Sequence, residues 1–317
     1  MKQRIFTFLL IALVAGITAC RKSGTDPDIN EYDEQQIKAY ISANNLEGFT
    51  RDAEGFNDTS GIYYKILEPG RGDRIQYSDK VSLVFSLKSF DGKYSSVDTI
   101  TNHVSDYVGL LASAGRTKGL QLGIHNLLKY KGGSMRMMIP SHLAYGVSGI
   151  GSGSVTNVNT RIAGNQSLDY FVRVIDNQDV YDEAVIKRYL NDHNLTGYAK
   201  DPKGYWYKVI TPGTGPAGEI KQFSKVYPTY VGSLLNGAEF DAAHKTTVVT
   251  EPFVPGDNLT EGVADAFIKH GSTGTSLSLF VPSNLGYGEP AQQGETVSIP
   301  PYGILHFEFQ IQKVEQP

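Results

Sequence analysis

The spacing of hydrophobic residues changes in the same order in each half of this chain. Apolar side chains within 37–41 recur at helical spacing, whereas those within 62–66 alternate with polar side chains, as in a strand. The segment 205–209 repeats the alternation in the second half, and further strands are expected at Val81–Leu87 and Val226–Leu235. The pattern predicts a short helix followed by several strands, twice over.

The sequence itself repeats in the same register. EYDEQQIKAYISANNLEGFTRDAEG, from Glu31, aligns with VYDEAVIKRYLNDHNLTGYAKDPKG, from Val180, and YYKILEPGRG returns as WYKVITPGTG. A repeat of this length indicates two copies of one structural unit. We expect copy one to span residues 31–178 and copy two to span residues 179–317.

The ends of the predicted helices follow from local signals. The acidic pair Asp33-Glu34 is expected in the first turn of the opening helix, where the helix dipole favours negative charge. Gly48 and Gly197 follow these helices as turn or cap residues. A central helix is expected at Leu120–Tyr130 in copy one and at Val263–Lys269 in copy two.

The N-terminus is typical of a lipoprotein leader. Lys2 and Arg4 precede an apolar run that is too short to span a membrane comfortably, and small residues then lead to Cys20, the only cysteine in the chain. This order resembles a bacterial lipobox, which implies a signal peptide over residues 1–19 and lipidation of Cys20. An ordinary signal peptide with an incidental cysteine is the alternative.

The ten or so residues after Cys20 are polar and contain Gly and Pro, so residues 20–30 are predicted to be a flexible tether. The expected location is the cell envelope. We expect lipid to anchor the protein to a membrane there, and the outer membrane is the expected one. Whether it faces the periplasm or the outside stays open.

Each copy ends in a strand, a tight turn, a loop and a returning strand. In copy two these parts lie in Leu277–Ile311, around LGYG, and in copy one in Met135–Asp176, around LAYG. This pattern, with its IP-x-x-LAYG motif, resembles the C-terminal half of the FK506-binding-protein (FKBP) type of peptidyl-prolyl isomerase. The resemblance implies the α+β fold class, with two FKBP-like domains. Each would be an antiparallel sheet wrapped on a short helix and preceded by a short N-terminal helix.

In copy two the resemblance extends to the pocket of the family. The matching positions are Tyr230, Phe240, Asp241, Val263, Tyr287, Ile299 and Phe307. The four apolar residues of this set are expected to bury a proline ring. Tyr287 is expected to donate to the preceding carbonyl, beside a polar wall of Tyr230 and Asp241. Val263 stands where the family has tryptophan, and Phe253 stays outside the set because two registers are possible there.

Copy one keeps fewer of these features. Its corresponding positions, which form a degenerate pocket, are Phe85, Tyr94, Leu120, Tyr145 and Tyr170. Ser95 or Ser96 stands where the family has a carboxylate, and the loop Val147–Asn165 is rich in Gly, Ser and Asn. Copy one is therefore expected to bind weakly, or only to space copy two from the membrane.

Composition excludes several other classes of function. The 29 basic and 33 acidic residues are nearly balanced, which gives no reason to expect nucleic acid as a partner. The glycine pattern at 213–218 leads into no helix, so it does not indicate dinucleotide binding. The histidines are scattered and no cysteine pair exists, so neither a metal nor a cofactor is expected.

The family resemblance implies a peptidyl-prolyl cis-trans isomerase, and the leader-like N-terminus leads us to expect that it assists the folding of exported proteins at the cell envelope. Its partners would be proline-containing segments of those proteins, and its membrane contact the lipid on Cys20. Rotation about the C–N bond must overcome roughly 20 kcal/mol and needs no covalent step, so an aromatic pocket suffices. The alternative is a peptide-binding or chaperone lipoprotein that keeps the fold without turnover. A third hypothesis is a structural surface lipoprotein that makes contacts through its long loops.

Overall fold

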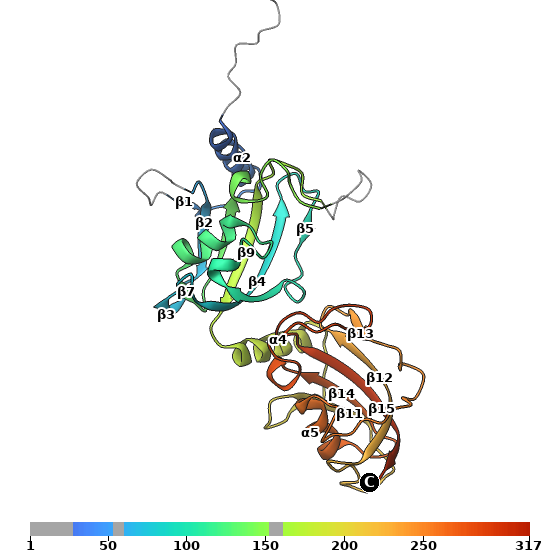
Figure 1. The fold of residues 1–317 in the computed structure, drawn as a ribbon. Helices are drawn as coiled ribbons and strands as arrows, with labels where there is room; N and C mark the ends of the chain where they lie inside the picture. Colours follow the sequence, from blue (N-terminus) through green and yellow to red (C-terminus); the bar gives the residue numbers. More distant parts are fainter. Residues whose placement is uncertain (1–27, 53–59, 152–160) are drawn as a thin grey trace, which may run out of the picture.

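Two antiparallel sheets, one from each copy, form the body of the protein (Figure 1). The computed structural model describes residues 28–52, 60–151 and 161–317. The predicted signal peptide, Cys20, most of the predicted tether and the middle of the loop 147–165 lie outside the described residues. Among the helices within these ranges, none combines the length and the apolar character that a membrane crossing requires.

Copy one begins with a helix and continues into a sheet with a second, shorter helix. Its helices are α2 (Ile29–Ala43), η1 (Val108–Leu110), α3 (Lys118–Leu122), the π-helical η2 (Gly123–Leu128) and η3 (Ser141–Leu143). Its strands are β1 (Thr50–Arg51), β2 (Tyr63–Glu68), β3 (Arg71–Arg74), β4 (Lys80–Ser89), β5 (Ser95–Ser96), β6 (His103–Tyr107), β7 (Tyr130–Lys131), β8 (Ser134–Ile139) and β9 (Leu168–Ile175).

Copy two repeats this order with fewer elements. Its helices are α4 (Gln178–Asp192), α5 (Glu261–His270) and η5 (Ser283–Leu285). Its strands are β10 (Ala199–Lys200), β11 (Trp206–Thr211), β12 (Lys225–Leu234), β13 (Glu239–Asp241), β14 (Ser276–Val281) and β15 (Leu305–Glu315). Each copy thus has an opening helix of the same length and one central helix.

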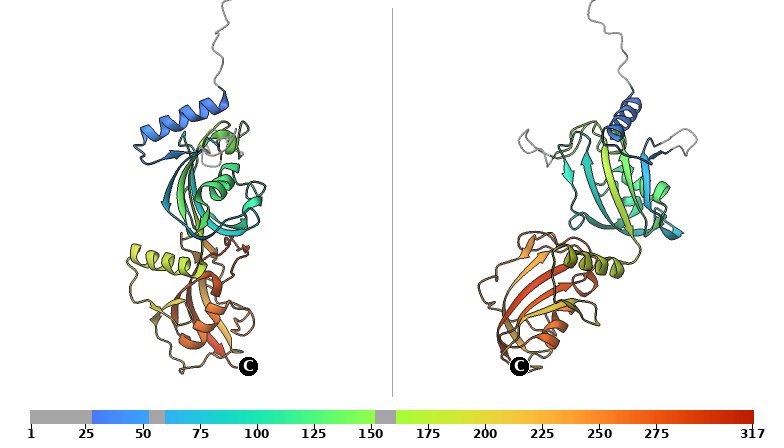
Figure 2. Two further views of the ribbon diagram at one scale, coloured as in Figure 1. Left: turned by 90° about the vertical axis from the view of Figure 1, so that its left-hand side faces the viewer. Right: turned by 180° about the vertical axis from the view of Figure 1, so that it is seen from behind.

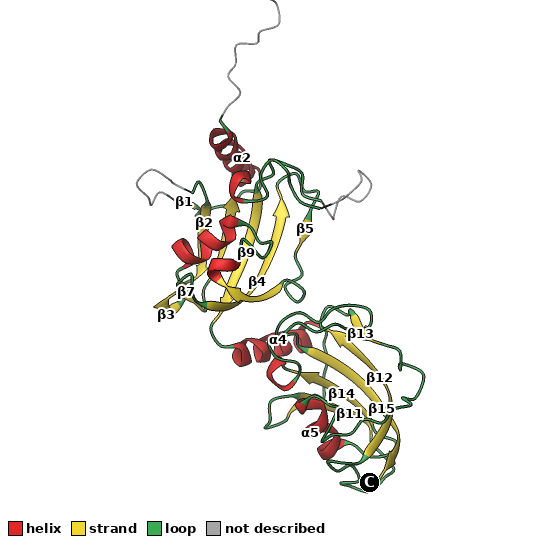
Figure 3. Ribbon diagram, in the orientation of Figure 1, coloured by secondary structure: helices red, strands yellow, loops and turns green. Residues whose placement is uncertain are grey.

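The two sheets have the same topology. The strand order β1-β2-β8-β9-β4-β5 in copy one corresponds to β10-β11-β14-β15-β12-β13 in copy two, and β6 pairs with β4 in addition. Few helices accompany many strands (Figure 3). The predicted α+β class with antiparallel sheets is confirmed.

Alternation along the strands builds the core of copy two. In β12 every second residue is buried, and Tyr230 and Leu234 point to the same side as Val226. In β15 the buried residues are Leu305, Phe307, Phe309 and Ile311. Since β12 and β15 are neighbours in the sheet, their inward side chains face α5 as one apolar surface.

The prediction for the start of the opening helices is wrong. α2 begins at Ile29, inside the predicted tether, and α4 begins at Gln178, where the side chain of Asn177 caps the helix by accepting from the backbone N–H of Val180 at 3.0 Å. Asp33 and Asp182 therefore lie beyond the first turn, and both are buried. These carboxylates make tertiary contacts, which the preference of a helix start for negative charge does not predict.

Each of these aspartates ties its helix to the turn that follows β8 or β14. Asp182 Oδ2 accepts hydrogen bonds from the backbone N–H of Ser283, at 2.8 Å, and from its hydroxyl, at 2.6 Å. In copy one, Asp33 accepts from the hydroxyl of Ser141 at 3.0 Å and also contacts His142. The opening helix is thereby fixed against the tight turn in both copies.

An asparagine, and not the glycine, is the left-handed residue that follows the end of each opening helix. Asn45 and Asn194 adopt φ angles of 51° and 53°, and the next residue in each case donates its N–H back to the last turn of the helix. Gly48 and Gly197 also have positive φ, as the turn prediction required, but they lie three residues further on.

The two copies lie end to end, and the opening helices α2 and α4 project on the same side of the molecule (Figure 2). Copy one approaches copy two near α4 and near the turn between β12 and β13 (Figure 1).

Candidate functional site

A cavity of about 470 Å³ opens in copy two between the sheet and the start of α5. Six of the seven residues predicted for the site line it: Tyr230, Phe240, Asp241, Val263, Tyr287 and Phe307. The volume lies within the range of pockets that bind small ligands. The sequence therefore brings residues from two strands of one hairpin, a helix, a loop and the last strand to one place.

The hairpin formed by β12 and β13 supplies the polar part of the cavity. Its two strands pair with Gly232 opposite Asp241, and the turn between them contains Asn236 and Gly237, with φ 84° at Gly237. Gly232 is required by packing, because a Cβ there would come within 2.6 Å of the Phe240 ring. The missing side chain lets that ring lie across the strand.

Tyr230 and Asp241 form a hydrogen-bonded pair in the cavity. The Tyr230 hydroxyl donates to Asp241 Oδ2. Burial, and then the hydrogen bond to this carboxylate, raise the pKa of Tyr230 far above its usual range, so the hydroxyl stays protonated. The pair fixes the orientation of the carboxylate.

Among the residues that the structure describes, two buried polar atoms of the cavity have no hydrogen-bond partner. They are Asp241 Oδ1 and the hydroxyl oxygen of Thr260, the residue before α5. Buried polar atoms are normally paired, and an unpaired one is costly. Since both residues line the cavity, a ligand with a hydrogen-bond donor would satisfy Asp241 Oδ1.

Aromatic rings form the apolar walls. Phe240 packs edge-on against Phe307, with ring centroids 5.6 Å apart, and Tyr230 stacks on Phe309 at 5.7 Å. Val263 enters from the first turn of α5 and is almost fully buried. At this position valine leaves more room in the cavity than the tryptophan of the resembling family would.

Tyr287 lies at the mouth of the cavity, after the turn η5. It is 42% exposed, more than any other residue of the predicted set. Partial burial, and then the charge of Asp241, raise the pKa of its phenol. The hydroxyl is therefore a proton donor at neutral pH, within the electrostatic reach of Asp241.

One predicted residue does not line the cavity, and several that do were not predicted. Ile299 is buried in the same core, but its backbone pairs with Gln292 in the loop before β15. Phe253 and Phe309 do line the cavity, as do Leu259 and the polar residues Asp257, Asn258 and Thr260. Phe309 could have been found from the alternation of β15, since it follows Phe307 by two residues on the same face.

In copy one the corresponding residues pack as core. Leu120 and Tyr170 are fully buried, and Phe85 lies 5.8 Å from the Tyr170 ring. The guanidinium of Arg116 lies over the Phe85 ring at 5.1 Å. Tyr94 and Tyr145 pack against the same cluster. Ser95 and Ser96 form β5, so neither of these two positions brings a carboxylate like that of Asp241.

Comparison with known proteins places these features in context. The chain is 30% identical over 125 residues to the FKBP-type peptidyl-prolyl cis-trans isomerase FkpA of Aeromonas hydrophila, which covers 38% of this chain and 42% of that protein. It is 27% identical over 269 residues to the peptidyl-prolyl cis-trans isomerase FKBP10 of Bos taurus, covering 82% of this chain and 38% of that protein. The chain thus spans less than half the length of either relative. No protein-family model matches it.

Solved structures give similarities of the same kind. FkpA from Escherichia coli is matched with a TM-score of 0.36 and 24% identity, over 43% of this chain and 61% of that one. The three FKBP domains of wheat FKBP73 are matched with a TM-score of 0.33 and 15% identity, over 86% of this chain and all of that one. In sequence, the chain is thus similar to parts of proteins named as peptidyl-prolyl cis-trans isomerases of the FKBP type.

Proposed function

We propose that this protein is a peptidyl-prolyl cis-trans isomerase and that the copy-two cavity is its active site. The observation that carries the proposal is the cavity itself. It joins apolar rings to a fixed carboxylate whose Oδ1 is buried without a partner in the described part of the chain, and a tyrosine donor lies at its mouth. The similarity to named isomerases supports the same reaction.

The geometry suits a non-covalent mechanism. A proline ring would occupy the apolar part of the cavity, between Phe240, Val263 and Phe307. The Tyr287 hydroxyl would donate to the carbonyl before the proline, and Asp241 would accept a donor from the substrate. Catalysis requires that the twisted amide bind better than either planar form. Transfer of the amide from water to an apolar cavity favours the twisted state, because resonance in the planar amide is strongest when water stabilises its charge separation.

The location and the clients belong to the same proposal. Lipidation of Cys20 would attach the protein to a membrane of the cell envelope, and its substrates would be proline-containing segments of exported proteins. The support is the leader-like N-terminal sequence, with its positive residues, short apolar run and Cys20. Metabolic labelling with a radioactive fatty acid, compared between the native chain and Cys20→Ser, tests the anchor.

A proline-limited refolding reaction separates turnover from binding alone. The full chain should accelerate refolding of an unfolded protein whose slow phase is prolyl isomerisation, a phase of tens to hundreds of seconds without a catalyst. Asp241→Ala should abolish most of the acceleration. Binding of the unfolded protein without acceleration would instead establish a chaperone that keeps the fold without turnover, an alternative that the small Val263 floor favours.

A further inference from the structure

Copy one contacts the loop that carries Tyr287. Glu289, two residues after Tyr287, accepts a hydrogen bond from the hydroxyl of Ser105 at 3.0 Å and forms an ion pair with Lys80 Nζ. Ser105 lies in β6 and Lys80 is the first residue of β4, so both partners belong to the copy-one sheet. The loop at the mouth of one copy's cavity is thus attached to the other copy.

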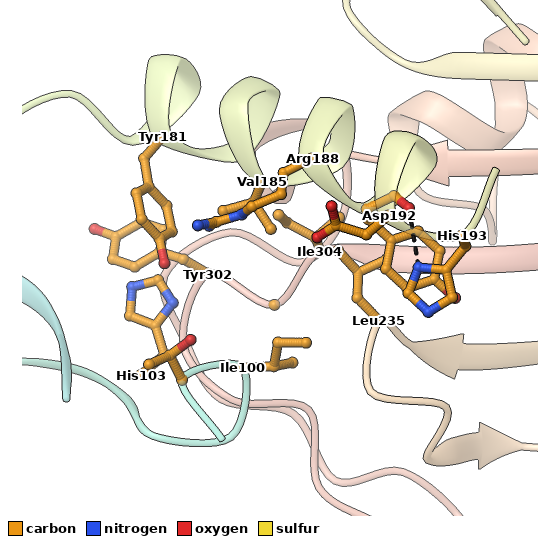
Figure 4. A pocket seen from close by; sticks show the side chains of 13 residues that line it. Ile100, His103, Tyr181, Val185, Arg188, Asp192, His193, Leu235, Tyr302 and Ile304 are labelled. Atoms are coloured by element: carbon orange, nitrogen blue, oxygen red, sulfur yellow. Dashed lines mark hydrogen bonds between the residues drawn. The ribbon is translucent and has the colours of Figure 1, made fainter. Parts of the chain in front are cut away.

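A second contact reaches the same loop through Tyr302. Its backbone N–H donates to the carbonyl of Gly288, at 2.9 Å, directly between Tyr287 and Glu289. The centroid of the Tyr302 ring lies 5.6 Å from that of the His103 ring in copy one, and Figure 4 shows His103 below the rings of Tyr302 and of Tyr181, which belongs to α4. His103 is buried and bonded to the Ser82 hydroxyl at 2.8 Å, so it is a fixed support.

A third contact involves the hairpin that carries Asp241. Asn236, in the turn between β12 and β13, donates its side-chain N–H to Asp98 Oδ2 of copy one, at 2.6 Å. Ile100, two residues after Asp98, packs against the apolar clusters of copy two. Leu235 and Ile304 line the cavity of about 240 Å³ at this junction, together with Ile100 (Figure 4). Copy one therefore contacts two of the segments that bring polar groups to the proposed active-site cavity, the Tyr287 loop and the hairpin that carries Asp241.

We propose that copy one is a brace for the active site of copy two, and that Lys80 and Glu289 are positioning residues that hold the Tyr287 loop. The consequence for turnover rests on the proposed isomerase function. A single exposed ion pair contributes little, and Lys80 and Glu289 are 46% and 39% exposed. The brace acts because three separate contacts converge on two short segments, and small displacements of a catalytic group are expensive in rate.

A charge-reversal cycle in the full chain tests the ion pair. Lys80→Glu and Glu289→Lys should each lower kcat/KM for an X-Pro peptide about three- to ten-fold, with kcat affected more than KM. The double variant, which restores an ion pair in the opposite sense, should recover most of the loss. Glu68→Gln, which breaks the exposed pair between Glu68 and Arg173 on copy one, is the matched control and should leave kcat/KM unchanged. Equal activity of the single variants and the native chain would overturn the proposal.

A second cycle asks whether the ion pair acts through Tyr287. If it does, Lys80→Glu should have almost no further effect in a Tyr287→Phe chain, because the hydroxyl that the brace positions is already absent. Losses that multiply in the combined variant would show that Lys80 acts elsewhere, and would overturn the assigned role. The thermal midpoint of each variant distinguishes both results from a loss of folded protein.

Hydrogen exchange tests the brace without using activity. The amides of Gly288 and Tyr302 are hydrogen-bonded in the braced loop and should exchange faster in Lys80→Glu, then return toward the native rate in the charge-reversed double variant. Unchanged exchange in Lys80→Glu would contradict the brace. If the native chain has no isomerase activity while exchange responds as expected, the proposed function fails and the brace stands.

Discussion

Tyr230 and Asp241 are joined by a hydrogen bond that leaves one carboxylate oxygen, Asp241 Oδ1, buried and unpaired within the described residues. The arrangement costs stability in the ligand-free protein, since buried polar atoms normally have partners. Locally unfavourable arrangements of this kind are typical of functional sites. The pair therefore gives the most specific predictions for copy two.

Removal of the carboxylate should impair activity more than stability. We expect Asp241→Ala to lower kcat/KM by roughly ten-fold or more, since a hydrogen bond to a charged group contributes about 1.5–3 kcal/mol. The Tyr230 hydroxyl would then turn to water in the cavity. A peptide isomerisation assay measures the loss. Ser95→Ala is the matched control, because Ser95 is one of two candidates for the equivalent position in copy one, and it should leave the rate unchanged.

The hydroxyl of Tyr287, at the mouth of the copy-two cavity, gives an independent prediction. Tyr287 is 42% exposed, and Tyr287→Phe removes only its hydroxyl. The thermal midpoint of the variant should therefore stay within a few degrees of that of the native chain. The rate should fall about five-fold, as expected for one neutral hydrogen bond. A rate equal to that of the native chain would remove Tyr287 from the mechanism. Tyr145→Phe provides the comparison in copy one.

The affinity of the cavity for a ligand should depend on the size of the side chain at position 263. Val263→Trp fills space beside Phe240 and Phe307, and we expect tighter binding of a macrolide inhibitor of the FKBP pocket, measured by calorimetry. Val263→Leu should give an intermediate affinity. The substitution also risks overpacking, which typically costs 1–3 kcal/mol, so chemical denaturation must accompany the binding data. Weaker binding by a fully folded Val263→Trp would contradict this account of the floor.

The link between α4 and the η5 turn should contribute to stability. Asp182→Ala removes the acceptor for both the N–H and the hydroxyl of Ser283, and leaves the buried N–H unpaired. We expect a loss of about 2–4 kcal/mol in the free energy of unfolding, measured with urea. Ser283→Ala should cost less, because the backbone hydrogen bond remains. Equal losses in the two variants would show that the backbone bond contributes nothing.

Two buried histidines predict a loss of stability in mild acid. Burial lowers the pKa of His103 and of His306 from 6.5 to about 4. Between these values the unfolded chain binds more protons than the folded one, so the stability that is present above pH 6.5 should be lost progressively as the pH falls to 4. The total effect should be on the order of 2–3 kcal/mol for each histidine. Urea denaturation at several pH values, repeated with His306→Gln, measures it, and a profile that the substitution does not flatten would refute the assignment.

The sequence was most informative where a residue pattern determines the structure locally. The alternating residues of β12 and β15 predicted two strands, and the repeat predicted that both copies share one topology. The helix starts were misplaced because the carboxylates of Asp33 and Asp182 bond residues more than a hundred positions away. A local rule cannot represent such contacts.

The sequence predicted most residues of the candidate site, but it did not predict which segments contact one another there. The family resemblance identified Asp241 and Tyr287, but the bridge between Val226 and Phe253, which brings Phe253 to the cavity, depends on a register that the sequence left open. The ion pair between Lys80 and Glu289 joins the two copies across the fold. Neither charge is unusual by itself, so only the tertiary structure could reveal that copy one contacts the Tyr287 loop.

The most direct test of the proposed function is catalysed isomerisation of a short X-Pro peptide by the purified full chain, with and without a macrolide inhibitor of the FKBP pocket. We predict acceleration that rises in proportion to protein concentration, is blocked by the macrolide and is largely lost in Asp241→Ala. No acceleration by a chain that unfolds cooperatively on heating would contradict the assignment of the copy-two cavity as an isomerase site.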